Sequence, residues 1–220
     1  MGQENALRHL QRLIDSSRSK VTVCGRVGHD NPARSFLGIR GDSMLGAIID
    51  QTGGLVVADG YIKHLGGDNR NGDDAMRANG LDLETIKEGR SIPQMLGALV
   101  VAVDALGGVF AIPSCVTDAS QVTVRYLPYD SLLWEDLRIG HREFVAWSLG
   151  PEVRELYPDE SVGSLVTGMM LRCVPPLWMP VGTGKKRSMS VAPVTKVVRE
   201  RIGMACAVME ATVPEGGATQ

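Results

Sequence analysis

Hydrophobic residues recur along this chain at two different spacings, one typical of helices and one typical of strands. Over residues 4–16 they fall three or four positions apart, which predicts an amphipathic helix. Residues His141–Leu149 predict a second helix, which Gly150-Pro151 ends. A last helix is predicted over about 193–209. Its apolar side carries Val194, Val197, Val198, Ile202, Cys206 and Met209.

Between these helices, pairs of short apolar runs predict antiparallel strands. Asp59-Gly60 separates the first pair, and such a dipeptide between two apolar runs is a strong hairpin signal. Residues 104–108 separate the second pair. No helical crossover intervenes within either pair, so the sequence predicts an α+β fold with an antiparallel sheet of hairpins, flanked by N- and C-terminal helices. The predicted strands are Val21–Cys24, Leu55–Ala58, Tyr61–Leu65, Ala98–Val103, Val109–Ile112 and Val122–Leu127, and further helices are predicted at Ser43–Gln51 and Leu81–Lys87.

Length and composition fit one domain. The chain has 220 residues, of which 44% are hydrophobic, and this is enough to form a core. We expect a single α+β domain over residues 1–210 and a disordered tail over 211–220. The first dozen residues lack the apolar core of a signal peptide, and the four cysteines are spaced like free, buried thiols in a reducing compartment, so we expect a cytoplasmic protein.

Charge and residue spacing argue against several classes of partner. A net charge of −2 and an aromatic content of 5% give no basis for direct nucleic-acid binding. The longest apolar run, residues 95–112, contains Asp104 and Gly107-Gly108, which favours two strands over a membrane span. Cysteines and histidines are not clustered, and the polar loop 66–74 lacks the ligand pattern of an EF-hand, so we expect no metal, no cofactor and a solvated loop there.

Catalytic motifs are also missing. Residues 182–186 resemble a phosphate loop, but Met179 and Lys186 stand where that loop needs glycine and a hydroxyl residue, which favours a basic hairpin turn. The chain contains no nucleophile elbow. His141 suits an exposed position in the first turn of a helix better than the role of a general base. The sequence therefore predicts no catalytic residue and leans away from an enzyme.

A short segment between the predicted strand Val122–Leu127 and the helix His141–Leu149 combines aromatic and acidic residues. Exposed aromatic residues ringed by acids suit protein contacts. For Trp134, a structural role is favoured over a partner contact. Glu135 and Asp136 are adjacent in an extended segment, so we expect them to face opposite ways. The candidate partner-binding residues are Tyr129, Asp130, Trp134, Glu135 and Asp136.

Four blocks of sequence together resemble an uncharacterised bacterial family, the domain-of-unknown-function family 2625 (DUF2625). Along with the N-terminal helix they follow that family's order over most of the chain. Pro113-Ser114-Cys115 departs from the family, which usually has Asn-Gly-Gly there, and any function carried by that turn is in doubt in this chain. The blocks are residues 43–67, GGVFAI at 107–112, residues 122–149, and PLWMP with the KKRSMSVAPVTKVV run that follows.

The family implies no activity, but its plan of strands, Trp-bearing turn and helix is similar to that of the SUKH superfamily. That resemblance implies an immunity-type module that binds and neutralises a toxin-like protein partner. An enzyme or small-ligand-binding protein is the alternative, with His141, Glu143 and Asp104 as the first residues to test. A third interpretation is an oligomeric scaffold in which the last helix forms the dimer interface, although packing into the core is favoured for that helix. The oligomeric state stays open.

Overall fold

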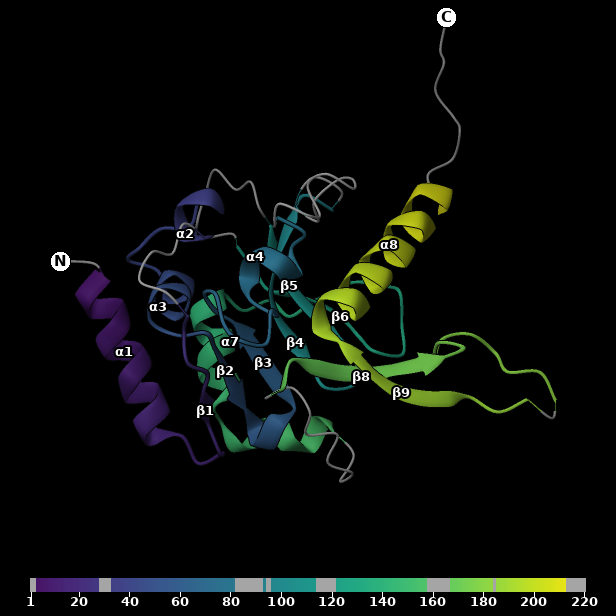
Figure 1. The fold of residues 1–220 in the computed structure, drawn as a ribbon, viewed down its shortest axis with the longest axis horizontal. Coiled ribbons are helices and arrows are strands. Elements are labelled where there is room, and N and C mark those ends of the chain that lie inside the picture. The colour runs from purple at the N-terminus through teal and green to yellow at the C-terminus, as the bar shows by residue number, and fades with distance from the viewer. Residues whose placement is uncertain are drawn as a thin grey trace, which may run out of the picture.

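A seven-stranded antiparallel sheet forms the centre of the molecule (Figure 1). The computed structural model describes residues 3–27, 33–81, 93, 96–113, 122–157, 167–183 and 185–212. Neighbours in the sheet are neighbours in the chain, so the predicted antiparallel sheet of hairpins is confirmed. Its strands are β1 (Thr22–Val23), β2 (Gly54–Val57), β3 (Ile62–Leu65), β4 (Ala98–Asp104), β5 (Val109–Pro113), β6 (Arg125–Leu127) and β7 (Glu135–Asp136).

The predicted terminal helices and the helix after β7 are present as well, which confirms the α+β class. Ser43 begins one of the helices between strands, since its side chain accepts a hydrogen bond from the Gly46 N–H at 3.0 Å. The helices are α1 (Gln3–Ser16), α2 (Ala33–Phe36), α3 (Met44–Gln51), α4 (Ala75–Ala78), α7 (His141–Ser148) and α8 (Val194–Thr212), with 3-10 turns η1 (Ala58–Gly60) and η3 (Pro151–Leu156).

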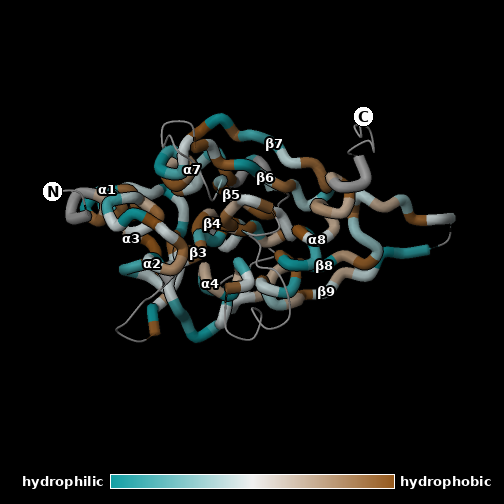
Figure 2. Tube along the Cα trace, turned by 90° about the horizontal axis from the view of Figure 1, so that it is seen from above, coloured by the Kyte–Doolittle hydropathy of each residue, from teal (hydrophilic) through white to brown (hydrophobic). Residues whose placement is uncertain are grey.

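Both faces of the sheet are covered. Directly paired residues share a face, so His64, Phe110 and Tyr126 stand in one cross-strand row on the face that packs against α7. Lys63 and Val103 point to the other face, where α4 and α8 pack. Hydrophobic residues concentrate along β4 and β5, whereas the outer strand β7 is largely hydrophilic (Figure 2). The core therefore lies on both sides of the middle strands.

The last helix packs into this core through the predicted apolar side. Val194, Val198 and Ile202 are fully buried, whereas Met209 near its end is exposed. The favoured interpretation of this helix as a core element agrees with these burials. Within the described residues, none of the helices is long and apolar enough to cross a membrane.

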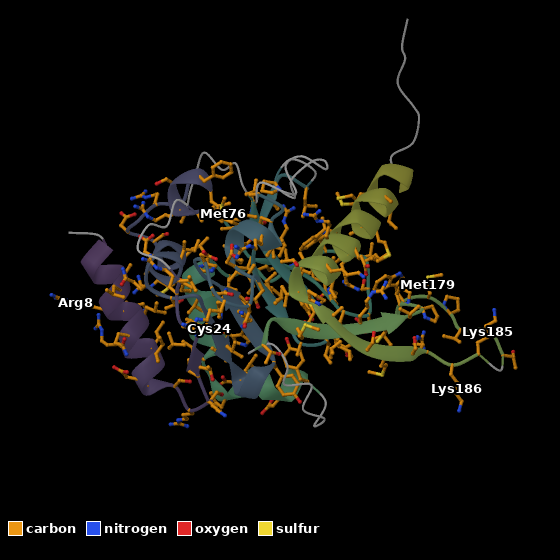
Figure 3. All side chains as sticks on the ribbon, viewed as in Figure 1. Arg8, Cys24, Met76, Met179, Lys185 and Lys186 are labelled. Atoms are coloured by element: carbon orange, nitrogen blue, oxygen red, sulfur yellow. The ribbon has the colours of Figure 1, made fainter. Side chains whose placement is uncertain are left out.

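A two-stranded hairpin, whose strands the hydrophobic pattern did not predict, projects from the body beside α8 (Figure 1). It consists of β8 (Met169–Val174) and β9 (Ser188–Pro193). Lys185 and Lys186 are exposed in the connection at its outer end (Figure 3), so this part of the chain is the basic hairpin turn that the sequence predicts.

The expectation of a solvated loop at residues 66–74 is wrong. Asp73 and Asp74 are buried, and each has a partner that explains its burial. The Lys63 ammonium donates to Asp73, and the Asp74 side chain caps α4 by accepting from the Met76 and Arg77 N–H groups at 3.0 and 3.1 Å. The acids at the end of this loop therefore serve the fold, Asp73 through its contact with Lys63 and Asp74 by capping α4.

Cys24, Cys173 and Cys206 form no disulfide among the described residues, and they are half-buried where the sequence predicted buried thiols. Several other predictions lie outside the described residues. These are most of a helix expected at Leu81–Lys87, Ser114 and Cys115 of the altered turn, and residues 213–220 of the expected tail; α8 itself continues to Thr212.

Candidate functional site

The outer edge of the sheet carries the segment of aromatic and acidic residues that the sequence predicts to bind a partner. We call Tyr129–Asp136 the recognition segment. Its last two residues form β7, which pairs with β6 through Tyr126 opposite Glu135. β7 is the last strand in the order of the described sheet, and both of its side chains are exposed. The recognition segment therefore borders the sheet on the side remote from α1 (Figures 1 and 2).

A pocket of about 500 Å³ lies beside this edge, on the face of the sheet that α7 covers. Most of its wall is aromatic or aliphatic, and Glu135 is the acidic residue that lines it. We call it the edge pocket. Its lining residues are Phe110, Tyr126, Pro128, Tyr129, Glu135, Leu137, Ile139, Trp147 and Tyr157.

Stacked rings hold the wall of the edge pocket in place. The Phe110 and Tyr126 rings stack at 4.5 Å between centroids, and Phe144 of α7 lies 4.7 Å from Phe110. Trp147 stacks on Phe144 at 5.9 Å. Aromatic pairs at these separations add to the stability gained by burial alone. Side chains of β5, β6 and α7 thus form the wall, and the ring contacts hold them together.

Asp104 holds the pocket-lining residue Tyr126 in position. Its Oδ1 accepts hydrogen bonds from the Leu106 and Gly108 N–H groups, each at 2.8 Å, and its Oδ2 accepts one from the Tyr126 hydroxyl at 2.7 Å. Complete burial raises the pKa of the Asp104 carboxyl above its usual value, although these donors oppose the shift. Asp104 therefore closes the β4–β5 turn and fixes Tyr126.

The three acids of the recognition segment differ in their surroundings. Asp130 and Glu135 are exposed, and Glu135 faces the edge pocket. Asp136 is exposed too, but its Oδ1 accepts a hydrogen bond from the Arg138 N–H at 2.8 Å. This bond lowers the pKa of the Asp136 carboxyl below its usual value. Asp130 and Glu135 are therefore the acids best placed to meet a partner.

The aromatic residues of the segment are more buried than its acids. Trp134 packs against the core, and its buried indole N–H has no hydrogen-bond partner among the described residues. Tyr129 is half-buried and lines the edge pocket, and burial raises the pKa of its phenol. Leu133 between them is 70% exposed. Sequence analysis did not name Leu133, although it lies within the segment.

The residues considered for the enzyme alternative do not form one site. Among the described residues, no recorded hydrogen bond or ion pair joins Asp104, His141 and Glu143. The expectation that His141 is exposed is wrong, since both of its ring nitrogens are buried and neither has a described partner. Burial lowers the pKa of His141 to about 4. Glu143 is exposed in the first turn of α7.

His141 lies against a second buried histidine, with the two ring centroids 6.4 Å apart. His64 Nε2 lies 2.7 Å from Ser148 Oγ, and the Ser148 hydroxyl donates to the Val145 carbonyl at 2.8 Å. Since the serine hydrogen is used there, Nε2 of His64 is assigned the donor, and its buried Nδ1 is left without a described partner. His64 and Ser148 are fully buried between β3 and α7, whereas His141 is half-buried and only its ring nitrogens are shielded from solvent.

Most residues that build the edge pocket around the recognition segment were not predicted from the sequence. Phe110, Trp147 and Tyr157 are not among the candidate site residues. Their positions depend on which strands become neighbours, and a single sequence does not specify that. Alternation of side chains along Val122–Leu127 was the available signal for Tyr126, because it places Tyr126 on the same face as Val124.

Within the described ranges, no group of three or more His, Cys, Asp or Glu side chains is placed to hold a metal ion.

Comparison with known proteins gives a family match without an activity. A family model described as "Protein of unknown function DUF2625" matches residues 1–196. A Haemophilus influenzae protein (strain ATCC 51907 / DSM 11121 / KW20 / Rd) described as "Uncharacterized protein" is 28% identical over 149 residues, covering 67% of this chain and 64% of that protein. No solved structure matches.

Proposed function

This chain belongs to the family described as protein of unknown function DUF2625, and from its sheet edge we propose that it is a cytoplasmic protein-binding module. One observation carries the proposal. The recognition segment exposes a leucine, Leu133, and two acids, Asp130 and Glu135, and it contributes Tyr129 and Glu135 to the wall of an aromatic pocket. Interfaces concentrate binding energy where an apolar anchor fills such a pocket inside a polar rim.

The edge favours recognition by side chains over addition of a strand. β7 has only two residues, and both are acidic. Short, charged edge strands oppose pairing with another chain. A partner would therefore place an apolar side chain in the edge pocket and basic groups opposite Asp130 and Glu135. Complementary charge of this kind speeds association and sets specificity.

A basic toxin domain is the partner class that we propose. The acids of the recognition segment and the net charge of −2 support a basic partner. The similarity in plan to the SUKH superfamily supports the immunity-type role, and it remains a prediction. Under this proposal the protein neutralises its partner by covering a basic surface.

Site-specific photo-crosslinking tests the proposal. We would place a benzophenone amino acid at position 133 in the recognition segment, or at the exposed position 12 on α1 as a control, and identify the captured proteins from the source cell. The charge reversal Glu135→Lys should weaken capture at position 133 by about tenfold or more, because a rim charge then opposes a basic partner. The matched reversal Asp15→Lys on α1 should not weaken it.

Two results would count against the proposal. One is that position 133 captures nothing, or only what position 12 also captures. The other is that both charge reversals act alike. If the captured partner arrests growth when produced alone, co-production of this protein should relieve the arrest, and Glu135→Lys should remove that relief.

A further inference from the structure

A second hollow, separate from the edge pocket, lies between α8 and the β8 strand. Its volume is about 320 Å³, near the lower end of the range for small-molecule sites. We call it the α8 pocket. Its floor is the β4–β5 turn, which β8 holds through a hydrogen bond from the Leu171 N–H to the Ala105 carbonyl at 2.8 Å. Apolar side chains form most of its wall, among them Leu106, Val197 and Met204.

Arg201, a buried cation that forms no salt bridge among the described residues, lines the α8 pocket. Arg201 is only 4% exposed. Its recorded hydrogen bonds all go to neutral backbone carbonyls, those of Pro128, Tyr129 and Ser131. Its Nε–H is buried with no described partner, and no recorded ion pair among the described residues joins it to an acid. Burying a charge without a counter-charge is costly, so this site favours an anion.

Nearby acids favour the charged form of the Arg201 guanidinium, although none of the described ones forms a salt bridge with it. Burial lowers the pKa of Arg201 to about 10, while the negative charges of Asp104 and Asp130 favour its charged form. The guanidinium stays charged at neutral pH. Its carbon lies 4.5 Å from the centre of the Trp178 ring, which also lines the pocket. The ring covers one face of the guanidinium.

The acid that lines the pocket does not cancel this preference. Both carboxylate oxygens of Glu200 are held by Arg172, at 2.8 Å from Nε and 3.3 Å from Nη2. That pair is neutral as a unit. Among the described lining residues, Arg201 is therefore a cation without a direct salt bridge, in mostly apolar surroundings and with the charges of Asp104 and Asp130 nearby.

We propose that the α8 pocket binds a small monocarboxylate with an apolar tail. The carboxylate accepts the Nε–H of Arg201, and the tail lies along Leu106, Val197 and Met204. A phosphate or a dicarboxylate fits less well, because the described lining offers no second free cation. This inference rests on Arg201 and does not depend on the proposed partner at the edge pocket.

Octanoate and its neutral isostere octanamide test the charge requirement with the full-length protein at pH 7. Calorimetry should show saturable octanoate binding, and octanamide should bind about tenfold or more weakly, as expected for loss of a charge-assisted hydrogen bond. The Arg201 Nε–H resonance in NMR spectra should shift as octanoate saturates the protein. That resonance reports on the proposed contact directly.

Variants locate the binding. Met204→Trp fills the pocket and should abolish octanoate binding, whereas Met209→Trp, five residues further along α8 and exposed, should retain it. Arg201→Lys keeps the charge but removes Nε, and it should weaken octanoate binding about tenfold while leaving octanamide unaffected. Because Arg201 also holds the Pro128–Ser131 turn, the Met204 variant keeps the test independent of any loss of folding. The proposal is overturned if octanamide equals octanoate, if neither binds, if the Nε–H resonance is unmoved, or if Met204→Trp binds normally.

Discussion

The buried histidine pair makes a specific prediction about acid stability. Burial lowers the pKa of His64 to about 3 and that of His141 to about 4. In the unfolded chain both imidazoles take up a proton below about pH 6.5. Between these values the unfolded state binds more protons than the folded state, so the free energy of unfolding falls as the pH falls. Each histidine adds about 1.4 kcal/mol per pH unit to the slope of the unfolding free energy against pH. This holds over the pH range in which the imidazole is neutral in the folded state and protonated in the unfolded state.

Replacement of His141 by phenylalanine isolates one of these contributions. Across the window from pH 6.5 to pH 4, His141 accounts for about 3 kcal/mol of lost stability, an order-of-magnitude value. At pH 7, His141→Phe should be at least as stable as the wild type, because it removes two buried nitrogens that lack described partners. Urea unfolding at a series of pH values between 5 and 6.5 measures the slope, which should be shallower by about 1.4 kcal/mol per pH unit.

Controls separate this effect from other titrating groups. Burial also lowers the pKa of His9 on α1, which is half-buried, so His9→Gln should make the slope shallower by less than His141→Phe does. Asp104, whose pKa burial raises, acts in the opposite direction, but it is present in every variant and cancels in the comparison. Equal slopes for the wild type and His141→Phe would refute the assignment of a buried, neutral imidazole at position 141.

Two further predictions concern the other face of the sheet and its β4–β5 turn. Lys63→Met leaves the buried Asp73 carboxylate without its cation and should cost about 3–5 kcal/mol in urea unfolding, while the double variant with Asp73→Asn should recover much of that loss; a double variant as unstable as the single one would contradict this. Gly108→Ala places a methyl group 2.0 Å from Asp104 Oδ2 and should cost about 1–3 kcal/mol, whereas Gly182→Ala, with open space around it, should be neutral by the same measurement.

The sheet was predictable where local signals coincide with the final pairing. Asp59-Gly60 lies between two apolar runs, and the structure joins those runs as β2 and β3. The helix after β7 was predictable because Gly150-Pro151 marks its end. The strands of the β8–β9 hairpin were not predictable from periodicity. β9 exposes five of its six residues, so it lacks the buried face that gives a strand its alternation of apolar and polar residues. Hydrophobic periodicity detects burial, and an exposed arm lacks it.

Buried polar groups were the least predictable part of the molecule. Lys63 lies within a strand whose four residues are all buried, and nothing local indicates that both faces of that strand are covered. Asp73, its partner, comes from a loop that looks solvated by composition. Arg201 did leave one signal, since it falls on the apolar stripe of the last helix, three and four residues after Val198 and Val197. A charged residue at such a position is either paired or available for a ligand.

Arg201 also connects the two pockets. Its hydrogen bonds to the Pro128, Tyr129 and Ser131 carbonyls tie α8 to the start of the recognition segment. Tyr129 lines both the α8 pocket and the edge pocket. A group that binds the Arg201 guanidinium therefore acts on the residue that holds the recognition segment in place. Because binding effects between two sites are reciprocal, a ligand that changes the position of this segment must itself be bound differently when a partner covers the edge.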